Sequence, residues 1–332
     1  MINASNFIRL PYAPDLTPTG IAYACRSLPH TYDRMGGADT CRLRRIVAGK
    51  AVELAFRRYL SAQNVPYDDL GATPFTDPDH YDIGFNGRRC DIKSFMFTQK
   101  RDIRRIQRFP SMLLKAAALV PTEQVASERL ADDDLYIFAF LTALVTDHPK
   151  EFDRAVAAGQ PSYLIYPLPE TWSHPLDWLP LGQLVLKSEN AETITIEAGG
   201  QDARHLFQTE QVSLHPGVRT HLQTEFYSLA YLHTTKMPAG RVGFHSQRLD
   251  QLCIVQPPQW GNIWVYGMSI FYTGYVTCGE FRRRAADLPP GSQVLQYAQT
   301  RTHNRSLPVA DLRPLDELYN NERKREATNL SP

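Results

Sequence analysis

Apolar residues recur at helical spacing between Asp39 and Pro66, where Leu43 and Val47 are among the positions that repeat. The side chain of Asp39 or of Thr40 can cap the start of a helix, and proline follows its end. The pattern predicts one long amphipathic helix over this segment.

The next segment, YDIGFNGRRCDIKSF at residues 81–95, consists of two short β-type runs around Asn86 and Gly87. Asn-Gly favours a tight hairpin, because a type I′ turn needs positive φ at both central residues. With a two-residue loop Asp82 lies opposite Asp91, whereas a bulge at Gly87 would shift the pairing by one residue.

Side chains alternate between the two faces of a strand, so this register puts Asp82, Asp91 and Lys93 on one face, with His80 beside Lys93. Opposed carboxylates repel each other by roughly 0.2–1 kcal/mol, and a cation between them relieves the repulsion. Mg²⁺ takes carboxylate oxygens plus several waters, and a nearby lysine can stabilise developing negative charge. The arrangement suits a metal site for phosphodiester hydrolysis. Taken alone, however, this pattern favours an ordinary Asp–Lys ion pair on a solvated face, and the context of the hairpin decides between the two.

Three short motifs follow one another in the chain: GKAVELAFRRYL with Glu53, DHYDIGF with Asp82, and CDIKS with Asp91 and Lys93. This order of helix, strand and strand resembles the PD-(D/E)xK nuclease superfamily, especially its restriction-endonuclease-like and resolvase-like members, over residues 40–147. The resemblance implies that Asp82 and Asp91 bind Mg²⁺, for which Mn²⁺ can substitute. It further implies that Lys93 assists the attacking water and that Glu53 is a supporting acid and metal ligand.

Two features leave the site assignment open. Asp91 stands where the family more often has glutamate, which shortens the reach to a metal ion. Asp79, in a second Pro-Asp pair, competes with Asp82 but falls on the opposite face by alternation. His80 is a second-choice contact to the substrate or to the site.

Basic residues are concentrated in QKRDIRRIQRF, at residues 99–109. Spacings of three and four line up Arg101, Arg104, Arg105 and Arg108 on one side of a helix. A DNA phosphate backbone could lie along this stripe, and a merely solvated helix face is the alternative.

Two further elements complete the first half of the chain. The segment from Pro110 predicts another helix, interrupted at Pro121. Residues 133–145 form a continuous apolar run, typical of a buried central strand. Helix, hairpin, helix and buried strand together indicate an α/β restriction-endonuclease-like core, a mixed sheet flanked by helices.

The second half of the chain contains short β-type runs separated by turn residues, among them GQLVLKS, ETITIEA and RVGFHS. Such spacing predicts a β-rich domain with a sandwich-like or barrel-like fold. Large aromatic residues here are expected mainly in the core, although an exposed Trp260 could stack on a base or sugar. Arg283, in the run RRR at residues 282–284, is a second candidate for phosphate contact.

Composition narrows the class of protein further. The 332 residues carry a net charge of only +1, so nucleic-acid affinity would have to come from local basic patches. Five cysteines without close pairing fit a reducing cytoplasm rather than a disulfide framework. With no signal-peptide pattern and no membrane-length apolar run, we expect a cytoplasmic protein with no membrane partner. The expected organisation is an N-terminal extension (1–38), a nuclease-like domain (39–155), a β-rich recognition or sensor domain (165–318) and a charged tail (319–332).

The function that these patterns predict is a Mg²⁺-dependent DNA endonuclease, either a type II restriction-like enzyme or one serving another antiviral defence. Its partners would be double-stranded DNA and a second copy of the chain, because two strands require two active sites. The alternatives are an effector nuclease activated by a ligand or by a modified base, a non-catalytic DNA-binding protein with a degenerate nuclease fold, and carbohydrate binding by the β-rich domain.

Overall fold

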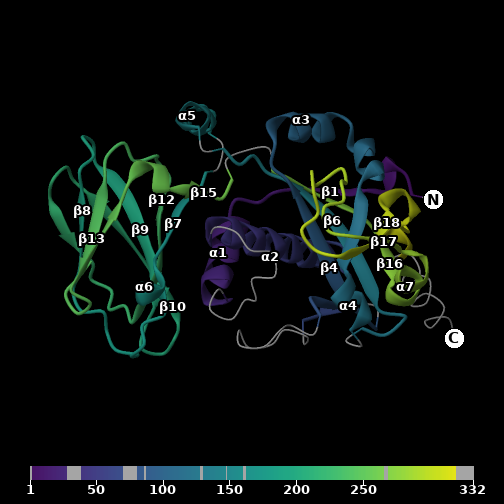
Figure 1. Cartoon of the computed structure of the whole chain (residues 1–332), viewed down its shortest axis with the longest axis horizontal. Coiled ribbons are helices and arrows are strands. Elements are labelled where there is room, and N and C mark those ends of the chain that lie inside the picture. The colour runs from purple at the N-terminus through teal and green to yellow at the C-terminus, as the bar shows by residue number, and fades with distance from the viewer. Residues whose placement is uncertain are drawn as a thin grey trace.

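The protein is described here from a computed structural model that covers residues 2–27, 39–69, 81–85, 87–127, 130–146, 148–159, 162–264 and 268–318. Within these residues the strands form four sheets. Figure 1 shows a mixed α/β half on the right and a β-rich half on the left, with α5 (Pro149–Ala157) between them at the top of the view.

The central sheet is mixed and curled, with the strand order β1-β16-β6-β4-β3-β2. Its strands are β1 (Ile8–Pro11), β2 (Tyr67–Asp68), β3 (Ile83–Phe85), β4 (Arg88–Phe97), β6 (Leu135–Thr142) and β16 (Ser269–Thr277). β4 and β6 run parallel, and the other neighbouring strands are antiparallel. Every residue of β6 is buried, which confirms the central strand predicted within residues 133–145.

Helices cover the two faces of this sheet. The long helix α2 (Asp39–Ala62) confirms the helix predicted over this segment, and it packs with α1 (Leu16–Ser27) on one face. The opposite face packs against α3 (Lys100–Arg108), α4 (Thr122–Ala126) and α7 (Cys278–Arg284). Both faces of β4 and β6 are therefore covered, as a parallel pair requires.

A small three-stranded sheet lies on that second face. Its strands are β5 (Ala117–Pro121), β17 (Ala286–Leu288) and β18 (Asn304–Pro308), in the order β17-β18-β5. The helix predicted from Pro110 is therefore wrong at residues 117–121, whereas Pro110–Lys115 form a 3₁₀ segment and α4 follows Pro121 as a short helix. The apolar residues that follow pair with β18 near the end of the chain, and such a tertiary contact overrides local helix preference.

Two antiparallel sheets form the β-rich half, and their inward side chains share one core that also includes the buried Trp172. The first sheet contains β7 (Leu164–Pro167), β9 (Ile194–Gln201), β10 (Phe207–Leu214), β12 (Ser228–Thr234) and β15 (Gly261–Asn262). The second contains β8 (Leu184–Ser188), β11 (Arg219–His221), β13 (Val242–Ser246) and β14 (Gln251–Val255). The short helix α6 (Glu170–Ser173) and the 3₁₀ segments Ala4–Asn6, Pro257–Gln259 and Val309–Asp311 complete the described elements.

The sheets do not follow the boundaries expected from sequence. β1 lies in the expected N-terminal extension and β16 in the expected β-rich domain, yet both belong to the central sheet beside β6. The chain thus leaves the α/β half after β6 and returns to it with β16. None of the helices in the described ranges is both long and apolar enough to cross a membrane.

A buried hydrogen bond fixes α2 to the sheet. The hydroxyl of Tyr272 on β16 donates to the carbonyl oxygen of Val52 at 2.6 Å, one residue before Glu53. We expect Tyr272→Phe to lower the free energy of unfolding by about 1 kcal/mol, because one buried hydrogen bond is lost. Urea titration followed by circular dichroism measures this change.

Tyr227→Phe is the matched control, since the hydroxyl of Tyr227 bonds to no residue in the described part of the chain. Equal urea midpoints for Tyr272→Phe and the wild type would contradict the anchoring role of Tyr272.

Candidate active site

The hairpin that carries the candidate residues has the predicted two-residue loop. Phe85 pairs with Arg88 and Ile83 with Cys90, and Gly87 has a φ of 67°. The alternative register, shifted by a bulge at Gly87, is therefore wrong.

The strand ladder ends at Asp82, and its carboxylate takes the place of a strand partner. Its backbone N–H donates to the carbonyl oxygen of Cys90 at 3.0 Å, and its Oδ2 accepts from the N–H of Ile92 at 2.6 Å. Its own carbonyl oxygen accepts from Arg57 Nη2 at 2.7 Å. Asp82 is thus held at the edge of β4 and does not simply face Asp91 across a regular ladder.

Asp91 and Lys93 lie on one face of β4, as the alternation predicts. Lys93 Nζ is 2.6 Å from Asp91 Oδ2 and donates to Gln124 Oε1 at 2.8 Å. The Lys93 side chain is only 15% exposed, and its ammonium lies 5.9 Å from the ring centre of Tyr136. This ion pair is therefore partly buried and is not a solvated surface pair.

Glu53 approaches from the other side of the sheet. α2, which carries it, packs against the face formed by Cys90 and Ile92, opposite Asp91 and Lys93. Glu53 Oε2 pairs with Lys50 Nζ at 2.7 Å. Glu53 and Asp91 therefore come from opposite faces of the sheet, and the charge of each acts on Asp82, which directly precedes β3.

The electrostatic surroundings of Asp82 link these residues. Burial of the carboxyl is the largest cause of a pKa raised well above the ordinary aspartate value, and the charges of Glu53 and then Asp91 raise it further. The N–H of Ile92 and the charge of Lys93 act in the opposite direction. All three charged candidates therefore act on one carboxyl, which a proton or a cation would stabilise.

A metal ion would find few ready ligands in this arrangement. In the ranges that the structure covers, no three His, Cys, Asp or Glu side chains are grouped so as to hold a metal ion. Asp91 pairs with Lys93, Glu53 pairs with Lys50, and the two acids come from different faces of the sheet. Mg²⁺ needs only one or two protein carboxylates with waters, so Asp82 and Asp91 fit as a minimal ligand pair. The second-choice residues Asp79 and His80 lie outside the described residues.

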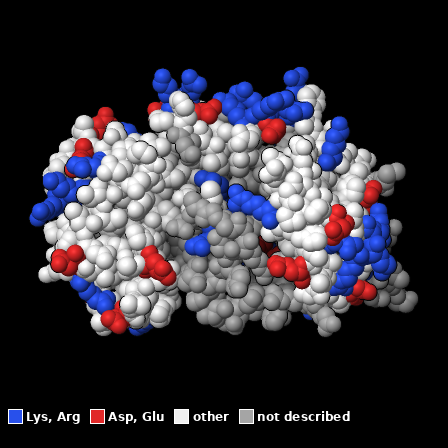
Figure 2. Space-filling view, in the orientation of Figure 1, with Lys and Arg blue, Asp and Glu red and all other residues white. Residues whose placement is uncertain are grey.

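The basic stripe forms as predicted. Arg101, Arg104, Arg105 and Arg108 are exposed on α3, while Ile103 and Ile106 on its other side are buried. Figure 2 shows Lys and Arg side chains gathered at the top of the molecule, where Figure 1 places α3 and α5. The stripe on α3 begins after β4 has ended at Phe97. At roughly 3.3 Å per residue along the strand, Lys93 lies about 13 Å before Phe97. The arginine stripe therefore lies beyond the end of β4 that is farther from Asp91.

Two further second-choice residues, Trp260 and Arg283, fall in the expected β-rich domain, and the structure places them differently. Trp260 is 3% exposed and packs near the ring of Tyr166, so the idea of an exposed stacking ring is wrong. Its loop turns inward because the indole contributes to the sandwich core. Arg283 is exposed on α7, while its neighbours Arg282 and Arg284 pair with acidic side chains.

Sequence reasoning missed three residues that position the site. Gln124 holds Lys93, Arg57 holds the backbone of Asp82, and Lys50 pairs with Glu53. The spacing of Lys50, Glu53 and Arg57 on one helix is a weak signal for such pairing. Nothing in the local sequence around Gln124 indicates its contact, which joins segments 31 residues apart.

No family model, curated protein or solved structure matches this chain. The resemblance to PD-(D/E)xK nucleases therefore stays a prediction that depends on the residues and geometry above.

The raised pKa of Asp82 predicts a particular dependence of stability on pH. The folded state holds the Asp82 proton more tightly than the unfolded state, whose reference value is 3.8, so stability contributed by this group falls as pH rises above that value. We expect Asp82→Asn to gain stability relative to the wild type as pH increases from about 4, with a constant gain above the folded pKa. Urea midpoints of both proteins between pH 4 and 8 measure the difference.

Asp250→Asn, at an exposed turn, shows the effect of an ordinary surface substitution. If the urea midpoints of Asp82→Asn and the wild type differ by the same amount at every pH, then the surroundings of Asp82 do not destabilise its charge.

Proposed function

We propose that this protein is a Mg²⁺-dependent DNA endonuclease that hydrolyses phosphodiester bonds with a PD-(D/E)xK-type site. The order of elements supports the proposal: α2 carries Glu53, the β3–β4 hairpin carries Asp82, Asp91 and Lys93, and α3 leads on toward β6, which is parallel to β4. A helix, a hairpin and a crossover to a buried parallel strand are what the resemblance requires of the core.

One observation carries the proposal: the charge of Asp82 is destabilised by burial and by Glu53 and Asp91, with Lys93 beside them. A hard cation at Asp82 and Asp91 would relieve this repulsion, and Mn²⁺ could take the same oxygen ligands. When bound, the ion would supply positive charge opposite the phosphate oxygens on which negative charge develops.

The protein's own groups have separate roles in this proposal. Asp91 and Gln124 hold the Lys93 ammonium, which would stabilise negative charge on the phosphate or orient the attacking water. The N–H of Ile92 and the guanidinium of Arg57 fix Asp82 from its side chain and its backbone. Glu53 acts through its charge, which keeps the affinity of Asp82 for a cation high.

The exposed arginines of α3 suit binding of double-stranded DNA, because each phosphate contact adds sequence-independent affinity. Cleavage of both strands would use two copies of the chain. Restriction or another defence against foreign DNA is the setting that suits a nuclease core joined to a separate β-rich half, and it rests on analogy.

A second candidate is a DNA-binding protein with a silent site. It is favoured by the lack of a three-residue metal-binding group within the described ranges. Cleavage and metal binding separate the two candidates.

We expect Lys93→Ala and Asp91→Asn each to lower the rate of DNA cleavage at least about 100-fold, because charge stabilisation at the phosphate is lost. The assay follows plasmid, phage and modified-base DNA over time with Mg²⁺, Mn²⁺ or EDTA. Lys236→Ala, which changes an exposed lysine paired with Glu192, is the matched control and should cleave like the wild type.

Absence of cleavage by the wild type on every DNA, together with equal heats of Mg²⁺ binding to the wild type and Asp91→Asn, would favour the silent-site candidate. Cleavage that survives in Lys93→Ala would overturn the site assignment.

We expect the double substitution Arg104→Ala/Arg105→Ala to reduce the salt dependence of duplex binding. Each lost phosphate contact lowers the slope of log affinity against log salt by about 0.9, so the slope should fall by about 2. Fluorescence anisotropy with a labelled duplex in EDTA measures it. Arg283→Ala tests the competing basic surface on α7, and a fall in slope there instead would move the DNA to that surface.

A further inference from the structure

The ammonium of Lys93 is held from two sides by groups of different kinds. Asp91 Oδ2 lies 2.6 Å away and Gln124 Oε1 accepts at 2.8 Å. A lysine ammonium has three N–H donors, so these contacts leave one for a further partner. The charge of Lys93 also acts on Asp82, where it lowers the pKa of the carboxyl against the larger effects that raise it.

Gln124 lies on α4, a helix of only five residues that depends on its neighbours for its position. The N–H of Thr122 donates to the carbonyl oxygen of His303 at 3.0 Å, and Arg282 Nε donates to that of Val125 at 3.3 Å. Strands and helices from the end of the chain therefore fix α4 against β4.

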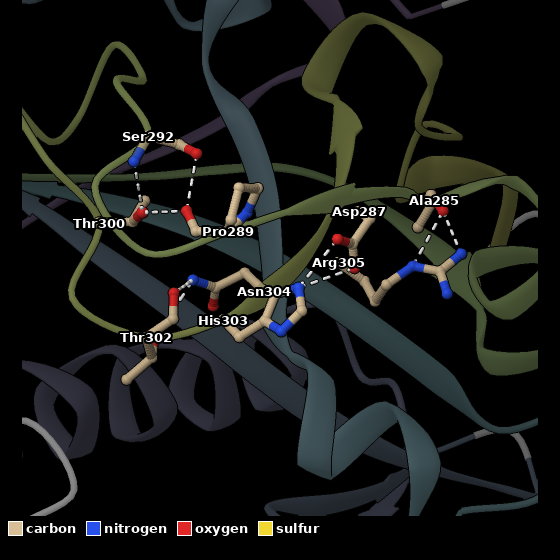
Figure 3. Close-up of polar contacts among 9 residues, drawn as sticks. All are labelled: Ala285, Asp287, Pro289, Ser292, Thr300, Thr302, His303, Asn304 and Arg305. Carbon is tan, nitrogen blue, oxygen red and sulfur yellow. Dashed lines mark hydrogen bonds and ion pairs between the residues drawn. The ribbon is translucent and has the colours of Figure 1, made fainter.

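The strand connection beside α4 is itself well fixed. Figure 3 shows the imidazole of His303 turned toward Asp287, with Nε2 2.8 Å from Oδ1. The same view shows Ser292 and Thr300 both donating to the carbonyl oxygen of Pro289, which closes the base of the loop between β17 and β18. A fixed α4 can hold a side chain in one place.

A neutral acceptor and a carboxylate affect a lysine differently. Asp91 orients the ammonium but also offsets its charge, whereas the amide oxygen of Gln124 orients it and leaves the charge intact. Titratable groups around Lys93 include Asp82 before β3 and Tyr136 on β6, with Cys278 beside Tyr136, while Glu123 on α4 is exposed.

We propose that Gln124 is a positioning residue for Lys93: its amide oxygen, carried by α4, holds the ammonium so that its third N–H points to the scissile phosphate. This inference rests on the proposed nuclease function. The ordering of the Lys93 ammonium by Gln124 can be measured whether or not the protein cleaves DNA.

The test uses Gln124→Met, which has a similar shape without the acceptor, and Gln124→Glu, which keeps an acceptor and adds charge. With DNA substrate, kcat should fall about tenfold in Gln124→Met with KM unchanged, because one hydrogen bond to the ammonium is lost. Gln124→Glu, which keeps an acceptor for the ammonium, should retain most of the wild-type kcat.

A second readout is independent of activity. The ¹⁵N–¹H signal of the Lys93 ammonium, identified by its loss in Lys93→Arg, should be visible in the wild type and in Gln124→Glu and lost in Gln124→Met. Gln296→Met is the matched control, because the side chain of Gln296 bonds to the backbone of Ala117 on neighbouring β5 and to no other group among the described residues. It should lower stability and leave both the ammonium signal and kcat unchanged.

The outcomes separate the two proposals. An ammonium signal that responds as expected in a protein that cuts no DNA would retain Gln124 as the positioning residue and refute the nuclease function. A wild type that cleaves, with Gln124→Met equal to it in kcat and in the ammonium signal, would overturn the inference about Gln124 and leave the function standing.

Discussion

The site depends on one backbone requirement: the N–H of Ile92 needs an acceptor where β3 stops. A buried N–H without a partner is costly, and here the carboxylate of Asp82 accepts its hydrogen bond. The same carboxylate carries a charge that burial, Glu53 and Asp91 all destabilise. The hydrogen bond that the Asp82 carboxyl accepts therefore stabilises the fold, whereas the negative charge of the same carboxyl destabilises it. Two basic residues act on this aspartate. Arg57 fixes its backbone, and the charge of Lys93 offsets part of the negative charge around it.

The sheet that carries this edge is assembled from distant parts of the chain. β4 pairs with β6 along its length, and β6 pairs with β16, which lies more than a hundred residues further on. The face with Lys93 is closed by α4, and α4 is held in turn by β18 and α7. The catalytic geometry that we propose therefore depends on the return of the chain after the β-rich half, and the first half alone does not contain it.

The sequence was informative where the decisive interactions are local. Three such patterns lie within short segments and are confirmed: the register of the β3–β4 hairpin, the periodicity of α2 and the apolar run of β6. Prediction failed where a distant partner decides: residues 117–121 pair with β18, and Trp260 turns into the sandwich core. Alternation along β4 correctly joined Asp91 to Lys93, but it could not reveal that the ladder ends at Asp82 or that α2 covers the opposite face. Those facts depend on how the layers stack, which no local pattern encodes.

The surroundings of Asp82 also bear on why this residue is there. Asparagine could accept the same hydrogen bond from Ile92 without a charge, so folding alone would favour a neutral side chain at this position. A charge kept at a place where it destabilises the fold is a feature of functional sites, where stability is given up for chemistry. Structural ion-pair networks can also shift a pKa, but they stabilise the charged form, whereas here the charged form is disfavoured. The direction of the shift therefore accords with the cation that we propose at Asp82, beside Lys93.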